Sequence, residues 1–141
     1  ATYKFYEKKD EIAEIVSNSN RNVITATNNV NKQFKMNNNF PIFMALIDIA
    51  WFREDVIPIT TDVPTGIGAE PYLDILQTFL NLDNHQDVGF KMMELQKEYW
   101  PEAKREFYPI DIEYQSCECR KYFSYVNGTK KFEGKNLFQT N

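Results

Sequence analysis

The sequence is poor in the residues that most metal, redox and disulfide sites need. Its 141 residues contain one histidine, His85, and two cysteines, Cys117 and Cys119. A single histidine excludes the two-histidine motifs of many zinc enzymes. A disulfide between cysteines only one residue apart would be strained. We therefore predict no metal site, no cofactor and two free thiols. Free thiols favour a cytoplasmic location over an extracytoplasmic one, although the compartment stays open.

Long apolar runs are also absent, so we predict no membrane insertion. The formal net charge of −4 is unevenly distributed. Residues 1–40 carry six basic and four acidic side chains, residues 41–118 carry five and fifteen, and residues 119–141 carry five and one. The acidic middle would repel nucleic-acid phosphates and attract a basic protein surface. We therefore predict no nucleic-acid binding and expect a protein partner with a basic surface.

Hydrophobic residues are plentiful, at 43% of the chain, and aromatic residues make up 15%. This content supports a folded core, and the length fits one domain. We predict a single globular domain over residues 1–141, with residues 134–141 as a loose tail. The excess of Asn, Lys and Ile is typical of an AT-rich genome, which favours a low-GC microbe or its virus as the source.

Helical spacing dominates the first two thirds of the sequence. Apolar residues recur at intervals of three and four over residues 3–36, which predicts one long helix or a helix pair divided near residues 17–21. Residues 40–52 are apolar on nearly every side and begin with Pro41, which favours a buried helix.

Two further helices are expected over residues 70–82 and 86–99. The second of them either ends at residue 99 or resumes over residues 101–107. A loop precedes the first of them at residues 64–68. Its Gly66 and Gly68 lack the third glycine and the lysine of phosphate-binding loops, so a plain loop or a mobile lid is expected.

The C-terminal third indicates β structure. Residues 110–115 alternate between apolar and polar, as a half-buried strand does. Asn127-Gly128 is typical of a hairpin turn, here joining residues 121–126 to residues 129–132, and we favour this turn over N-glycosylation of the same sequon. Residues 56–60 suit an edge strand or an extended segment. The predicted fold class is therefore α+β, with a small C-terminal antiparallel hairpin or sheet.

No catalytic constellation stands out. Asp111 and Glu113, two residues apart on the predicted strand, offer a divalent-cation site at most. Asp48 is a lone carboxylate in an apolar segment, so it must be paired, protonated or placed at a site. Aromatic residues at helix ends and acidic residues near them are typical of binding surfaces. The candidate binding residues are Asp48, Trp51, Asp87, Glu94, Glu98, Tyr99, Trp100 and Phe107.

These features favour a non-catalytic protein-binding domain of the inhibitor, immunity or regulatory type. A first alternative is a small-ligand-binding or sensory domain, with an extracytoplasmic location left open. Its ligand would lie among Asp48, Trp51, Trp100 and the loop at residues 64–68. A second alternative is a metal-dependent hydrolase or nuclease that uses Asp111 and Glu113.

Overall fold

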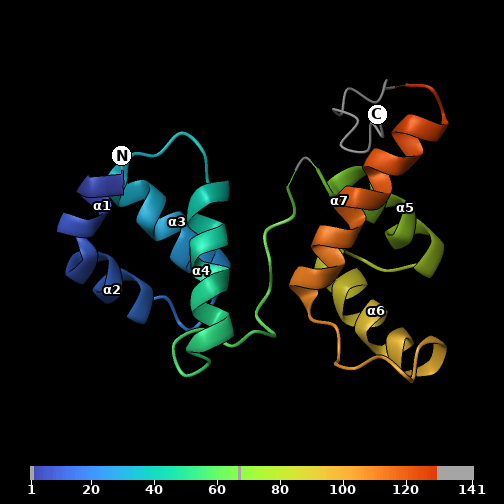
Figure 1. The fold of residues 1–141 in the computed structure, drawn as a ribbon, viewed down its shortest axis with the longest axis horizontal. Helices are drawn as coiled ribbons and strands as arrows, with labels where there is room; N and C mark the ends of the chain where they lie inside the picture. The colour runs from blue at the N-terminus through green and yellow to red at the C-terminus, as the bar shows by residue number, and fades with distance from the viewer. Residues whose placement is uncertain (1, 67, 130–141) are drawn as a thin grey trace, which may run out of the picture.

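The computed structural model describes residues 2–66 and 68–129, and every regular element in this part of the chain is an α-helix (Figure 1). In chain order the helices are α1 (Thr2–Glu7), α2 (Lys9–Ser17), α3 (Val23–Phe34), α4 (Phe40–Phe52), α5 (Glu70–Leu80), α6 (His85–Tyr99) and α7 (Pro109–Val126). The predicted α+β class is therefore wrong, because the described chain is all-helical. In the part of the chain that the structure describes, four helices rather than three follow residue 39.

The N-terminal lobe consists of α1 to α4. The predicted division near residues 17–21 is confirmed, since α2 ends at Ser17 and α3 begins at Val23. The predicted single helix or helix pair is nevertheless wrong, because the chain also breaks at Lys8, so that three helices occupy this part of the described chain. The Asn22 side chain caps α3 by accepting the Thr25 backbone N–H at 3.0 Å. Such a cap stabilises a helix by about 1 kcal/mol. The Asn-rich stretch therefore ends one helix and starts the next, as its composition indicates.

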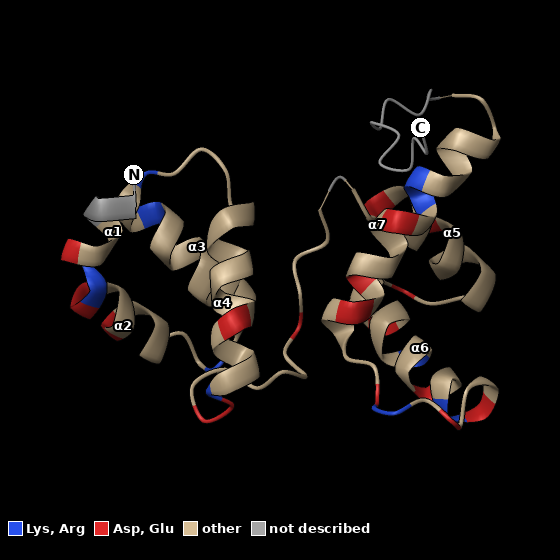
Figure 2. Ribbon diagram, in the orientation of Figure 1, with Lys and Arg blue, Asp and Glu red and all other residues tan. Residues whose placement is uncertain are grey.

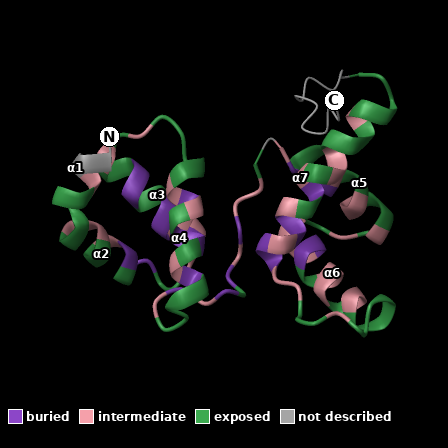
Figure 3. Cartoon of the chain, viewed as in Figure 1, coloured by how far each residue is buried: buried purple, intermediate pink, exposed green. Residues whose placement is uncertain are grey.

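Helix α4 has the bounds that the sequence predicts. Asp48 is its one charged residue, so the helix is almost uncharged (Figure 2). One face packs against α3 and buries Phe43, Leu46, Ile47 and Ala50 (Figure 3). These residues belong to the first of two hydrophobic clusters, which also contains Val16, Val23, Ala26, Val30, Ile57, Ile59, Val63 and Ile110.

Helices α5, α6 and α7 form the C-terminal lobe around a second cluster of Ala69, Leu73, Val88 and Ile112. The helices predicted over residues 70–82 and 86–99 are confirmed to within two residues at each end. Residues 101–107 form one turn followed by irregular structure rather than a resumed helix. Within the described residues, no helix is long and apolar enough to cross a bilayer. The assignment of the whole chain to one domain stays a prediction.

Helix α7 replaces the strand predicted at residues 110–115. Pro109 occupies its first turn, and Asp111 accepts the Tyr108 backbone N–H at 2.9 Å. Ile110 is buried in the first cluster and Ile112 in the second. Residues two apart on a helix point about 200° apart. The alternating pattern therefore arises because α7 buries two opposite sides, a situation that the strand interpretation did not consider.

The predicted hairpin is wrong for the same segment, because residues 121–126 belong to α7. Gly128 has a left-handed φ of 68° and donates its N–H to the Tyr125 carbonyl, while Thr129 N–H bonds the Ser124 carbonyl. This pair of bonds is a helix-ending Schellman motif, which needs glycine as a hairpin turn does. The turn at Asn127-Gly128 is thus present but ends a helix. Residues 130–132 of the predicted hairpin, and the predicted tail, lie outside the described residues.

Residues 53–69 connect the two lobes and pass between α4 and α7 (Figure 1). The strand or extended segment predicted at residues 56–60 is absent; turns occupy it, with Val56 N–H bonded to Arg53 O and Thr61 N–H bonded to Pro58 O. Ile57 and Ile59 of this connection are buried in the first cluster. The connection is therefore packed against the N-terminal lobe.

Candidate functional site

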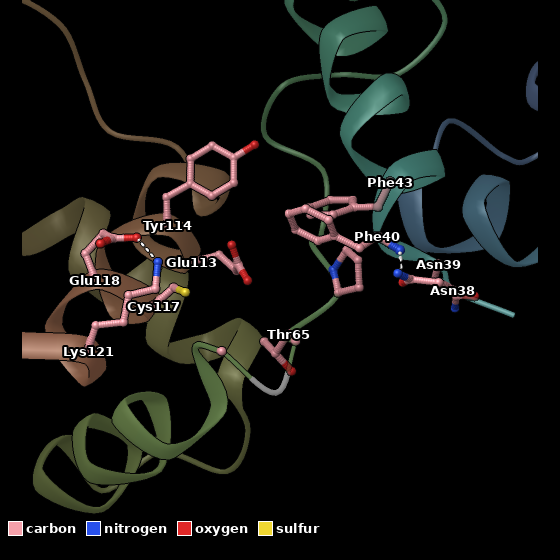
Figure 4. A pocket seen from close by; sticks show the side chains of 13 residues that line it. Asn38, Asn39, Phe40, Phe43, Thr65, Glu113, Tyr114, Cys117, Glu118 and Lys121 are labelled. Carbon is pink, nitrogen blue, oxygen red and sulfur yellow. Dashed lines mark hydrogen bonds and ion pairs between the residues drawn. The ribbon is translucent and has the colours of Figure 1, made fainter. Parts of the chain in front are cut away.

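A cleft of about 550 Å³ lies between the N-terminal end of α4 and the middle of α7, with the connection as its floor (Figure 4). Pockets for small ligands commonly measure about 300–1,000 Å³. The lining residues are Asn38, Asn39, Phe40, Phe43, Pro64, Thr65, Gly66, Gly68, Glu113, Tyr114, Cys117, Glu118 and Lys121.

The two helices touch at one end and separate at the other, which creates the cleft. Trp51, near the end of α4, meets Tyr108 at the start of α7 with ring centroids 5.6 Å apart. Six residues further along the chain, on α7, the Tyr114 hydroxyl lies 3.0 Å from the Met44 sulfur. Beyond this contact the connection passes between the helices, and Phe40 faces α7 across open space (Figure 4).

The α4 wall is aromatic. Phe43 is 3% exposed and anchors the wall in the first cluster, whereas Phe40 is 56% exposed. Their ring centroids are 6.4 Å apart. Asn38 fixes the start of the helix by accepting the Phe40 backbone N–H at 3.0 Å. An exposed aromatic ring beside a buried one provides apolar contact area that a ligand could cover.

The floor approaches α7 so closely that it requires glycine. A Cβ added to Gly68 would lie 2.8 Å from the Cys117 sulfur. Arg120, also on α7, donates from Nε to the Gly68 carbonyl. Gly66 is exposed in the cleft, and a Cβ there would lie 3.9 Å from a Glu113 carboxylate oxygen, an ordinary contact distance. The two glycines of the loop predicted at residues 64–68 therefore differ. Gly68 allows the loop to contact α7, whereas Gly66 lines the cleft without filling it.

Glu113 is the one acidic residue of the cleft that is buried, at 7% exposed. Burial raises the pKa of its carboxyl group, and a hydrogen bond from the Gly66 backbone only partly offsets this effect. The carboxyl group points from α7 toward Phe40 and Phe43 (Figure 4). A buried carboxyl group in a cleft, with a perturbed pKa, is a feature typical of functional sites.

The remaining charges of the cleft neutralise each other. Lys121 and Glu118 form an ion pair, and their side chains are 53% and 70% exposed. Such exposed pairs contribute little to stability. The interior of the cleft therefore carries the charge of Glu113 alone whenever that carboxyl group is ionised.

His85, the first residue of α6, contacts the floor of the cleft through Thr65. Its Nε2 lies 2.8 Å from Asp74 on α5, and its Nδ1 lies 3.3 Å from the Thr65 hydroxyl. A hydroxyl, an imidazole and a carboxylate in this order match a nucleophile, a base and an orienting group. The Asp74 side chain is 66% exposed, however, so water screens it and it orients the ring only weakly. The geometry favours a structural role, in which His85 ties the loop to α5.

Trp51 and Asp48, two of the predicted binding residues, lie on α4 outside the cleft lining. Trp51 is 43% exposed and joins the lobes through Tyr108 and the Arg105 guanidinium group, which lies 5.4 Å from the Trp51 ring centroid. Asp48 is exposed, and its charge contributes to the raised pKa of Tyr114, after the larger contributions of burial and Glu113.

The structure brings three other predicted residues together at the end of α6. Trp100 packs edge-on against Phe107 with centroids 5.6 Å apart, and Phe107 and Glu94 line a separate groove of about 210 Å³. Tyr99 is 76% exposed beside them in the sequence. These residues lie on the C-terminal lobe, apart from the cleft lining.

Two of the three acidic residues predicted on α6, Asp87 and Glu94, have hydrogen-bonded local partners. Asp87 accepts from the Asn84 side chain at 2.8 Å within the cap of α6. Glu94 pairs with Lys91 at 2.8 Å, and Glu98 contributes to the raised pKa of Lys91, after the larger influence of Glu94. These pairs reduce the acidic potential that this helix offers to a partner.

Asp111 and Glu113 do not form the shared carboxylate site that a strand would give. Both Asp111 oxygens accept from Arg105 at 2.7 Å, whereas Glu113 faces the cleft. Among the described residues, no group of three or more His, Cys, Asp or Glu side chains is placed to hold a metal ion. Cys117 and Cys119 are both free.

Glu113, Phe40 and Tyr114 are the cleft residues that sequence reasoning missed as a group. The alternating pattern predicts Glu113 on a strand beside Asp111, whereas it occupies a buried position of α7. Because Glu113 follows Ile110 by three residues, a helical interpretation of residues 109–126 places both on one face. Comparison of the chain with models of protein families, with curated proteins and with solved structures gives no match.

Proposed function

We propose that this chain is a small-ligand-binding domain whose site is the cleft between α4 and α7. One observation carries the proposal: a cleft of about 550 Å³ contains a carboxyl group that is 7% exposed. A buried carboxyl group is costly to keep in a folded protein unless a partner satisfies it. Apolar walls with few, well-placed polar groups are typical of ligand sites.

The test compares ligand binding in the native chain with binding in a variant whose cleft is filled. Gly66→Leu places an aliphatic side chain in the cleft, where a Cβ meets only an ordinary contact. Gln115→Leu, on the exposed side of α7, is the matched control because it adds the same side chain outside the cleft lining. A fragment library is screened by the rise in melting temperature that binding produces.

We expect some fragments to stabilise the native chain and the Gln115→Leu variant but not the Gly66→Leu variant. Fragments that stabilise all three proteins equally would place binding elsewhere. A screen in which no fragment stabilises the native chain would contradict the proposal.

Protein binding remains the second candidate, supported by the cluster at the end of α6. Trp100 is 49% exposed beside Phe107 and next to the groove that Glu94 lines. A partially exposed tryptophan with an acidic neighbour suits a basic partner. A peptide of alternating lysine and leucine is the probe. Trp100→Ala and Glu94→Lys should each weaken its binding, and unchanged affinity in both folded variants would eliminate this candidate.

A further inference from the structure

Glu113 has unused hydrogen-bonding capacity in the cleft. Among the described residues, the Gly66 backbone is its one hydrogen-bond partner. An ionised carboxylate can accept about four hydrogen bonds. The remaining positions face the cleft, where the carboxyl group points toward the α4 wall (Figure 4).

No cation of the described chain compensates this carboxylate. Lys121 is the one basic residue that lines the described cleft, and it pairs with Glu118. Ionising Glu113 therefore buries a charge that no described cation pairs with, which agrees with the raised pKa that burial produces. A cationic ligand would remove this cost, whereas an anion would increase it.

The walls suit an organic cation. Phe40 and Phe43 lie on one side of the cleft, and Tyr114 lies on the other (Figure 4). Aromatic faces attract ammonium groups and also pack against apolar carbon. A metal ion would need several oxygen or nitrogen ligands, and the described residues offer no such group here.

We propose that the cleft binds a small organic amine, whose ammonium group pairs with Glu113 while its apolar body packs against Phe40 and Phe43. This inference rests on the proposed function and names the ligand class of the same site.

The experiment uses two probes that differ in one group. 2-Phenylethylamine carries an ammonium group at neutral pH, and 2-phenylethanol replaces that group with a neutral hydroxyl. Calorimetric titration of both probes is carried out with the native chain, with Glu113→Gln and with the filled-cleft variant Gly66→Leu. Glu113→Gln keeps the side-chain shape and removes the charge, and its melting curve shows whether it is folded.

We expect the native chain to bind the amine about tenfold or more tightly than the alcohol, because a hydrogen bond between charged groups discriminates by at least this factor. Glu113→Gln should reduce this preference to about twofold or less without weakening the alcohol. Gly66→Leu should weaken both probes. Phe40→Ala should weaken both probes as well, since it removes shared apolar contact.

Two outcomes would overturn the inference and are distinguishable. If both probes bind equally, lose affinity in Gly66→Leu and are unaffected by Glu113→Gln, the cleft is a ligand site but not an amine site. If neither probe binds the native chain and no fragment stabilises it, the proposed function fails together with the inference.

Discussion

Gly68→Ala tests whether the floor of the cleft is seated on α7 as the structure shows. The added Cβ would lie 2.8 Å from the Cys117 sulfur and 3.8 Å from the Cys117 Cβ. The first distance requires a shift, and overpacking of this kind costs about 1–3 kcal/mol. Replacing glycine with alanine also lowers the conformational entropy of the unfolded chain, which stabilises the folded state by about 0.4–1 kcal/mol. We therefore expect a net loss of about 1–2 kcal/mol in the free energy of unfolding.

Cys117→Ala is the matched second substitution because it removes the sulfur and keeps the Cβ at its ordinary distance. In this background Gly68→Ala should be neutral or stabilising by up to about 1 kcal/mol. The coupling energy between the two positions should thus be about 1–3 kcal/mol, within the range seen for residues in contact.

Urea unfolding of the native chain, both single variants and the double variant, followed by helical circular dichroism, gives the four free energies. If Gly68→Ala costs the same with and without the sulfur, the contact between the loop and α7 is not the one described. The floor of the cleft would then have a different position.

Three further substitutions test the remaining parts of the account. The pKa of Glu113 in the folded state lies above the ordinary 4.5, so the stability that its protonated carboxyl group contributes is present below pH 4.5 and is lost as the pH rises through the folded-state pKa. Glu113→Gln should therefore raise the melting temperature at pH 7 more than at pH 4. An equal or opposite change would contradict the burial of this carboxyl group. Asp111→Ala removes the ion pair with Arg105 and the hydrogen bond from the Tyr108 N–H. It should lower the free energy of unfolding in urea by about 1–2 kcal/mol at neutral pH, and a change below about 0.3 kcal/mol would show that the ion pair does not stabilise the fold. Thr27 is 1% exposed, and its hydroxyl has no hydrogen-bond partner among the described residues. Thr27→Val should therefore stabilise by about 1 kcal/mol, and a loss of stability would reveal a partner for the hydroxyl.

The sequence predicts α3 and α4 better than α7 because their signals do not compete. In α4, an apolar run and Pro41 both favour a helix, and the predicted and observed bounds agree. In α3, the break after Ser17 follows from poor helix formers that are good caps. Local preference and burial point to the same structure in both cases.

Helix α7 is harder to predict from the same rules because its burial pattern depends on tertiary structure. Ile110 and Ile112 enter different clusters, so the helix has no single apolar stripe. A period of two then imitates a strand, and Asn127-Gly128 reinforces the error because a helix end also uses a left-handed glycine. Pro109 followed by Asp111 was the helix-start signal that this interpretation overlooked.

The cleft was only partly accessible from the sequence. The loop at residues 64–68 was named in the small-ligand alternative, and it forms the floor. Trp51, also named there, joins the lobes instead. The position of Glu113 depends on where α4 and α7 separate, which requires both the helical state of α7 and the path of the connection.

Amide NMR titration of the isotopically labelled chain with 2-phenylethylamine tests the central claim most directly, because it locates the ligand on the chain. We expect the largest shift changes at Phe43, Gly66 and Cys117, which represent the two walls and the floor. Changes confined to the groove at Glu94 and Phe107, or no changes at all, would contradict the assignment of the cleft as the binding site.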